Sequence, residues 1–282
     1  MDYGVNTWVW EAGLTTKKIE DLVPKVAGMG FDVIELPIAE VDAVDFERVD
    51  ELLDQFELDA TLCAVFGPDR DFIHPDDPEK RTNAINYVRG CVEGAGTLGA
   101  DRLGGPMYSA VGRVWQSTEA QREEHLEQLT GDLRGLSKFA DKHGVTLCIE
   151  PINRYETSFL NTVEQTLELV ERVDHPACGI LLDTFHLNIE EQSIPGAIRK
   201  AGDQLAHLHT CGNDRGAPGD GHIPWNEVGE ALADIDYDGR AVIESFTPEV
   251  ESIARAASIW RSFAPDQDHI AKKGLETLQK HL

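Results

Sequence analysis

The stretch VTLCIE, from Val145 to Glu150, is a short apolar run that ends in a carboxylate. Three later stretches repeat the pattern, and each ends in a side chain able to bind a divalent metal: Cys178–Asp183, Leu205–His209 and Arg240–Glu244. Short, continuous apolar runs are typical of strands that are buried on both faces of a parallel sheet. Since the runs follow one another at intervals of one helix and one strand, they predict a site at one end of a parallel barrel.

The rest of the chain alternates between the same kinds of segment. Strand-like runs such as Asp32–Ile38 alternate with amphipathic segments such as Phe46–Phe56, and this alternation predicts an α/β fold with a parallel sheet. Eight strand–helix units in 282 residues favour a closed (β/α)8 TIM barrel over an open sheet. We expect the first strand over Gly4–Trp10, the helix after the last strand over Val250–Ser262, and polar loops after the ligand-bearing strands.

Length and composition limit the domain count and the classes of partner. We expect one TIM-barrel domain over residues 1–282, with about residues 265–282 as a C-terminal helical extension. No apolar run is long enough to span a membrane, and the N-terminal residues lack a basic region followed by an apolar one. The five cysteines lack CxxC spacing, which suits reduced thiols. We therefore expect a cytoplasmic protein with no membrane partner.

The chain is strongly acidic, with 51 Asp and Glu residues against 25 Lys and Arg residues and a net charge of −26. Without a basic stripe, this charge argues against nucleic acid as a partner. The acidic residues are spread along the chain rather than gathered in a tail. Such a surface repels itself at low salt and is screened at high salt, so we hypothesise a halophilic host. An ordinary acidic enzyme is the alternative interpretation.

The four side chains at the ends of the later strands form the candidate metal site. Glu150, Asp183, His209 and Glu244 together supply three carboxylates and one imidazole, a hard, oxygen-rich set of ligands. This set suits Mn²⁺, Mg²⁺ or Co²⁺ in octahedral coordination better than structural zinc. The alternative is that each acid is a helix N-cap or a loop anion. His207 is interpreted as a buried neighbour of the site rather than a ligand.

Two residues in the following polar segments are candidates for binding a polar ligand. Arg215 stands in a Gly-rich segment that could fold over the metal site, and His186 lies shortly after Asp183. The alternatives are a solvated loop charge for Arg215 and a hydrogen-bonded histidine at the start of a helix for His186.

Several segments resemble the ketose 3-epimerases, the D-tagatose/D-psicose (allulose) 3-epimerase group of the xylose-isomerase-like TIM barrels. The resemblance runs from about Tyr3 to Trp260, and the segments that carry it are Cys148–Glu156, Leu182–Glu191, His207–Thr210 and Val242–Phe246. The string Asp-Thr-Phe-His-Leu-Asn-Ile-Glu-Glu, which begins at Asp183, is its most specific part.

The resemblance implies a metal-dependent isomerase that inverts C3 of a ketose through a cis-enediolate. Glu150, Asp183, His209 and Glu244 match the metal ligands of the family, with Mn²⁺ the expected ion. Glu150 and Glu244 also match its two catalytic acid/base groups on opposite faces of the sugar. The family is commonly dimeric or tetrameric, so we expect a homo-oligomer.

The resemblance also implies positions for the substrate. Glu156, His186 and Arg215 match residues that hold the sugar oxygens near C1 to C3, and Phe246 matches an apolar wall of the pocket.

The chain departs from the family pattern where the far end of the sugar is expected. Asn6 and Leu14 stand where these epimerases usually have aromatic residues, and the segment from Tyr108 to Trp115 differs from the usual loop. Tyr108, Arg113 and Trp115 are therefore candidates for a distal substrate contact, with packing of the loop as the alternative.

Two further functional interpretations stay open. The same barrel and metal suit an isomerase of aldoses or inososes, an inosose dehydratase, or an enzyme acting on 3-oxo-glycosides, including C-glycoside cleavage. A sugar-binding barrel without catalysis is the third interpretation. The pair Glu150 and Glu244 argues against it, because a binding protein needs no base on each face.

Overall fold

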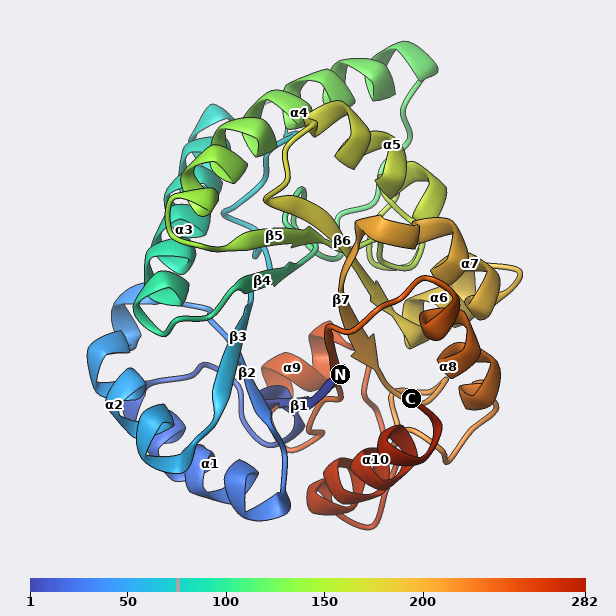
Figure 1. Ribbon diagram of the computed structural model, residues 1–282. Helices are drawn as coiled ribbons and strands as arrows, with labels where there is room; N and C mark the ends of the chain where they lie inside the picture. The colour runs from blue at the N-terminus through green and yellow to red at the C-terminus, as the bar shows by residue number, and fades with distance from the viewer. Residues whose placement is uncertain (75–76) are drawn as a thin grey trace.

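The computed structural model describes residues 1–74 and 77–282, apart from the side chains of residues 252, 253 and 256. Eight parallel strands form a closed barrel in the order β1 to β8, and β1 pairs with β8 to close it. Figure 1 shows the strands gathered at the centre with the helices around them. The predicted TIM barrel is thus confirmed. The strands are β1 Asp2–Asn6, β2 Val33–Pro37, β3 Asp59–Cys63, β4 Arg102–Gly105, β5 Thr146–Ile149, β6 Cys178–Asp183, β7 Leu205–Thr210 and β8 Arg240–Ile243.

The helices form the outer layer and begin at polar capping residues. Thr118 and Thr162 each form a capping box with a glutamine three residues later, which satisfies backbone N–H groups at the start of α4 and α5. No helix among the described residues combines the length and apolar content needed to cross a bilayer. The helices are α1 Thr16–Met29, α2 Phe46–Phe56, α3 Pro78–Thr97, α4 Glu119–Asp141, α5 Val163–Val173, α6 Thr184–Glu190, α7 Ile194–Ala201, α8 Trp225–Asp234, α9 Glu251–Ala256 and α10 Gln267–His281.

Two segments near the site differ from the expectations. The first strand ends at Asn6 rather than Trp10, because the Asn6 side chain accepts a hydrogen bond from the Trp8 amide and caps a short 3₁₀ helix, Thr7–Val9. The segment after Asp183 is the helix α6 rather than a loop, and Asp183 is its N-cap. Both differences arise from side-chain caps that act at the carboxyl end of a strand.

The C-terminal segment packs onto the barrel. Helix α10, inside the segment expected as an extension, contacts β1 and β8. A Cβ atom at Gly274 of α10 would lie 2.5 Å from Ile243 Cδ1, so glycine is needed for this close approach. Helix α10 therefore contributes to the outer layer beside β1 and β8. Figure 1 shows α10 outside the ring of strands.

Candidate functional site

The four candidate ligands lie together at the carboxyl ends of four successive strands. Glu150 follows β5, Asp183 ends β6, His209 lies in β7 and Glu244 follows β8. Each offers one ligand atom, and these atoms all lie within 4.8 Å of one another. All four side chains are buried. Neighbouring parallel strands bring consecutive strand ends together, which explains how residues far apart in sequence form one cluster.

The chemistry of this tetrad fits a divalent cation. Within the described part of the chain, Glu150 Oε1 and His209 Nδ1 are buried and have no hydrogen-bond partner. Buried polar atoms without partners are costly, and a cation would satisfy both. Three carboxylates with one imidazole suit a hard octahedral ion such as Mn²⁺, Mg²⁺ or Co²⁺.

Asp183 serves both the site and the local fold. Its Oδ1 accepts a hydrogen bond of 2.8 Å from the Phe185 amide and so caps α6, while its Oδ2 contacts Arg215. The N-cap alternative therefore holds for one oxygen of Asp183, while the other oxygen faces the guanidinium of Arg215.

Arg215 is buried in the site instead of exposed on a loop. Its Nη1 donates to Asp183 Oδ2 and, at 2.6 Å, to Glu244 Oε2, and its Nη2 lies 3.0 Å from His186 Nε2. The guanidinium also lies over the rings of Phe185 and Phe246. The backbone of Arg215 is left-handed, with φ of 68°, and its carbonyl accepts from Ser245 Oγ at 2.6 Å. Arg215 thus neutralises part of the charge of two candidate ligands.

The two glutamates of the tetrad differ in proton affinity. Burial, followed by repulsion from Glu244, raises the pKa of Glu150 well above its usual range. Burial also opposes ionisation of Glu244, but His209 and Arg215 outweigh it and lower the pKa of Glu244 to about 2. Burial and the adjacent Arg215 lower the pKa of His186 to about 3, which keeps this imidazole neutral.

A pocket borders the tetrad and has a polar and an apolar part. Trp8 and Phe246 pack against each other in a tilted arrangement, with 5.4 Å between ring centroids, and form part of its apolar wall. The polar lining residues are Glu150, Glu156, His186, Arg215 and Glu244, and the others are Trp8, Cys63, Val65, Pro106, Val111, Ile152, Phe246 and Ala257. Since Glu150 and Glu244 both line this pocket, a small ligand in it would contact the two carboxylates from strands five and eight.

The sequence matches the family described as "xylose isomerase-like TIM barrel" over residues 23–281. The chain belongs to this family. It is 35% identical to the D-psicose 3-epimerase of Enterocloster bolteae, over 98% of this chain and 94% of that protein. It is also 35% identical to the D-psicose 3-epimerase of Ruminiclostridium cellulolyticum, over 87% and 84%. The crystal structure of the Clostridium cellulolyticum H10 D-psicose 3-epimerase with D-tagatose has a TM-score of 0.90 and 30% identity, covering 100% of this chain and 99% of that one. These relatives confirm the resemblance to the ketose 3-epimerases. They show that the chain is an epimerase, which is an enzyme of the isomerase class.

The residues that the ketose 3-epimerase resemblance assigns to the near end of the sugar lie on the pocket. Glu156 accepts from Asn153 Nδ2 at 2.6 Å, and burial raises the pKa of Glu156. His186 Nδ1 accepts from the Asn153 amide at 3.1 Å. Asn153 therefore holds both side chains, and it is a residue that the sequence pattern did not single out.

The residues expected at the far end lie elsewhere. Tyr108 is fully buried and its hydroxyl donates to the Leu160 carbonyl at 3.2 Å. Arg113 pairs with Asp71 at 2.6 Å and lies over the ring of Trp115. None of Tyr108, Arg113 and Trp115 lines the pocket beside the tetrad. Pro106, directly after β4, and Val111 line it instead. The geometry thus favours the packing alternative for these three side chains.

The two positions near the N-terminus that depart from the family pattern, one at the end of β1 and one before α1, also lie off the pocket wall. Asn6 and Leu14 are buried and do not line it. Asn6 Nδ2 instead donates to Glu35 Oε1 at 3.1 Å. Glu35 is a residue that the sequence reasoning missed, although a carboxylate inside the apolar strand Val33–Pro37 signals a buried charge that requires partners.

Proposed function

We propose that this protein is a metal-dependent epimerase that inverts C3 of a free ketose of the psicose, fructose or tagatose type. The observation that carries the proposal is the placement of Glu150 and Glu244, from two different strands, on one pocket beside a cluster of hard ligands. The names of the relatives, D-psicose 3-epimerases that match nearly the whole chain, support the same substrate class.

Inversion next to a ketone requires a base on one face of the carbon and an acid on the other. One glutamate removes the proton from C3, and the electron pair moves toward the C2 carbonyl to give a cis-enediolate. The other glutamate then delivers a proton to the opposite face of C3. One proton leaves and one arrives, so the step is redox-neutral, and the two glutamates exchange roles in the reverse direction.

Charge develops on the substrate oxygens at C2 and C3, and the polar side of the pocket accommodates it. A bound divalent cation, for which we propose Mn²⁺ with Co²⁺ and Mg²⁺ as alternatives, would supply electrostatic stabilisation of these oxygens. Glu150, Asp183, His209 and Glu244 would hold it. We propose that Glu156, His186 and Arg215 orient the hydroxyl groups near C1 to C3, and that Phe246 excludes water from the face of the sugar.

The proposal predicts that the Mn²⁺-loaded protein incorporates deuterium from D₂O at C3 of D-fructose or D-psicose and forms the C3 epimer. Removal of the metal by a chelator should abolish both, and added Mn²⁺ should restore them. NMR of the recovered sugar measures deuterium at each carbon. Absence of exchange at C3 of every ketose tested, with metal bound, would refute the proposal. Turnover of a 3-oxo-glycoside instead would favour the alternative chemistry in the same barrel.

We further propose that the acidic surface is an adaptation to concentrated salt in a cytoplasm. At a net charge of −26 the folded chain repels itself, and salt screens this repulsion. We expect the melting temperature to rise by at least about 5 °C from dilute buffer to molar KCl. Differential scanning calorimetry measures the shift, and equal melting temperatures would contradict the adaptation.

A further inference from the structure

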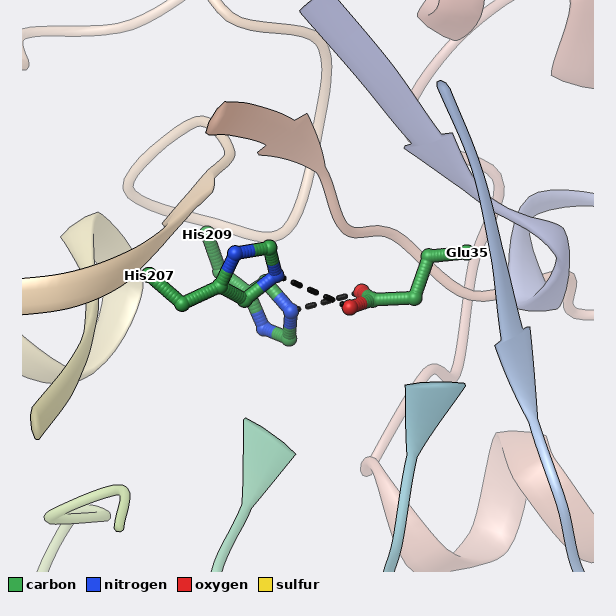
Figure 2. Close-up of side chains that lie close together, drawn as sticks. All are labelled: Glu35, His207 and His209. Carbon is green, nitrogen blue, oxygen red and sulfur yellow. Dashed lines mark hydrogen bonds and ion pairs between the residues drawn. The ribbon is translucent and has the colours of Figure 1, made fainter. Parts of the chain in front are cut away.

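Glu35 and two histidines form a buried cluster on the inner side of the barrel. Glu35 Oε2 lies 2.9 Å from His207 Nε2, and Glu35 Oε1 lies 2.7 Å from His209 Nε2. Figure 2 shows both imidazoles directed at the two oxygens of this one carboxylate. Glu35 comes from β2 and the histidines from β7, strands that are not neighbours in the barrel. The contact therefore crosses the barrel interior.

The strand register places the other partners of Glu35 beside it. Asn6 and Thr61 are the register partners of Glu35 on β1 and β3, so the three side chains form one row across the sheet. Asn6 Nδ2 donates to Oε1 at 3.1 Å, and Thr61 Oγ1 donates to Oε2 at 3.1 Å. Each oxygen of Glu35 thus has one neutral donor and one imidazole.

This arrangement differs from a second metal site, although Glu35, His207 and His209 are close enough to hold an ion. The carboxylate oxygens already accept from side chains of β1 and β3 and face both Nε2 atoms. His209 is moreover shared with the tetrad, since its Nδ1 lies 3.3 Å from Glu244 Oε1. A single imidazole therefore connects Glu35 on one side with the candidate ligands on the other.

We propose that Glu35 is a positioning residue that holds His209 with Nε2 toward itself and Nδ1 toward the tetrad. A neutral imidazole whose Nε2 faces a carboxylate oxygen at 2.7 Å favours the tautomer with its proton on Nε2 and a lone pair on Nδ1, which is the form that binds a metal through Nδ1. His207 fixes the second oxygen of Glu35. A Cβ atom at Gly104 would lie 3.5 Å from His207 Cδ2, so β4 packs closely against this ring. The inference rests on the proposed metal site.

Glu35→Gln tests the proposal, because it keeps the size of the side chain and removes its charge. We expect the dissociation constant for Mn²⁺ to rise about 10- to 100-fold. Electron paramagnetic resonance of free Mn²⁺, titrated into the chelator-treated full chain, measures it. The visible spectrum of the Co²⁺-loaded variant should also differ from that of the unsubstituted protein. At saturating Mn²⁺, the kcat of Glu35→Gln should lie close to that of the unsubstituted protein, because Glu35 acts on the metal only through His209.

Two further variants control for a purely structural effect. Asp71→Asn removes another fully buried carboxylate, which pairs with Arg113 and belongs to neither the tetrad nor the pocket. Its Mn²⁺ dissociation constant should stay within about twofold of the unsubstituted value. Thr61→Val removes one donor to Glu35 at nearly constant shape and should raise the dissociation constant about threefold.

The outcomes separate this inference from the proposed function. A folded Glu35→Gln variant with unchanged Mn²⁺ affinity and Co²⁺ spectrum would overturn the role of Glu35 and leave the epimerase proposal intact. If Glu35→Gln does not fold, an unchanged Mn²⁺ affinity in Thr61→Val would overturn the role of Glu35. Failure of the unsubstituted protein to bind Mn²⁺ would instead refute the metal site itself.

Discussion

Glu150→Gln and Glu244→Gln should each lower the rate of C3 epimerisation by about 10³-fold or more. A positioned acid or base contributes about 10²- to 10⁴-fold to proton transfer, and inversion requires one group on each face of the carbon. Glutamine keeps the shape of each side chain but neither accepts nor delivers the proton. Formation of the C3 epimer, followed by chromatography at saturating Mn²⁺, measures the loss.

The same two variants should differ in residual deuterium exchange. A variant with one remaining glutamate can remove and return a proton on only one face, so exchange should persist for one C3 epimer without inversion. The exchanging epimer should be opposite in Glu150→Gln and Glu244→Gln. Exchange of the same epimer in both variants would contradict a mechanism with two bases.

Asp183→Asn is the matched control for these variants. Asp183 belongs to the same tetrad but does not line the pocket, so it is close to the metal site without facing the sugar. At saturating Mn²⁺ this variant should retain inversion of both epimers at a reduced rate. Equal losses in all three variants would mean that metal affinity, not proton transfer, accounts for the effect.

Arg215→Met should lower kcat/KM by about 10²-fold and also lower the stability of the metal-free protein. The substitution leaves Asp183 and Glu244 buried without their shared cation, and breaking a buried ion pair costs about 3–5 kcal/mol. Because Mn²⁺ would return positive charge to these carboxylates, it should raise the melting temperature of this variant more than that of the unsubstituted protein. Calorimetry with and without Mn²⁺ measures the difference.

Arg113→Met separates a general effect of losing an ion pair from an effect on the site. Arg113 pairs with the buried Asp71, outside the pocket. Its loss should lower the melting temperature without a special response to Mn²⁺ and with kcat/KM retained. Full activity in Arg215→Met would show that Arg215 only supports the fold.

Much of the barrel could be predicted from sequence because its strands and helices carry strong periodic signals. The second helix was expected over Phe46–Phe56 and has those bounds, and the sixth strand ends at Asp183 as expected. Two misses lie where a side chain caps the chain at the end of a strand. A single hydrogen bond from the Trp8 amide to Asn6 Oδ1 ends β1 early, and hydrophobic periodicity does not indicate such a contact. A third miss is the helix expected over Val250–Ser262, which is the shorter α9, Glu251–Ala256, followed by the left-handed backbone of Ser258 with φ of 57°.

The parts of the candidate site also differed in how well the sequence predicted them. The tetrad was readable because each candidate ligand ends an apolar run, so the fold alone brings the four together. The distal contacts were not readable, since the loop from Tyr108 to Trp115 packs against Phe159 and Asp71 by tertiary contacts that no local pattern encodes. Glu35 was visible as a charge within an apolar strand, but its two imidazole partners lie on β7, where His207 is 172 positions further along the chain than Glu35.

Under the proposed function, Asn6 would couple sugar selection to metal affinity. Its Oδ1 fixes the amide of Trp8, which lines the pocket, while its Nδ2 supports Glu35 behind His209. Directed evolution that remodels the pocket through residues 6–8 will therefore alter metal affinity together with substrate range. Val111 lines the pocket from the loop after β4 and belongs to a different part of the chain from Asn6, Glu35 and Thr61. Under the same proposal, substitution of Val111 should change the substrate range without changing metal affinity.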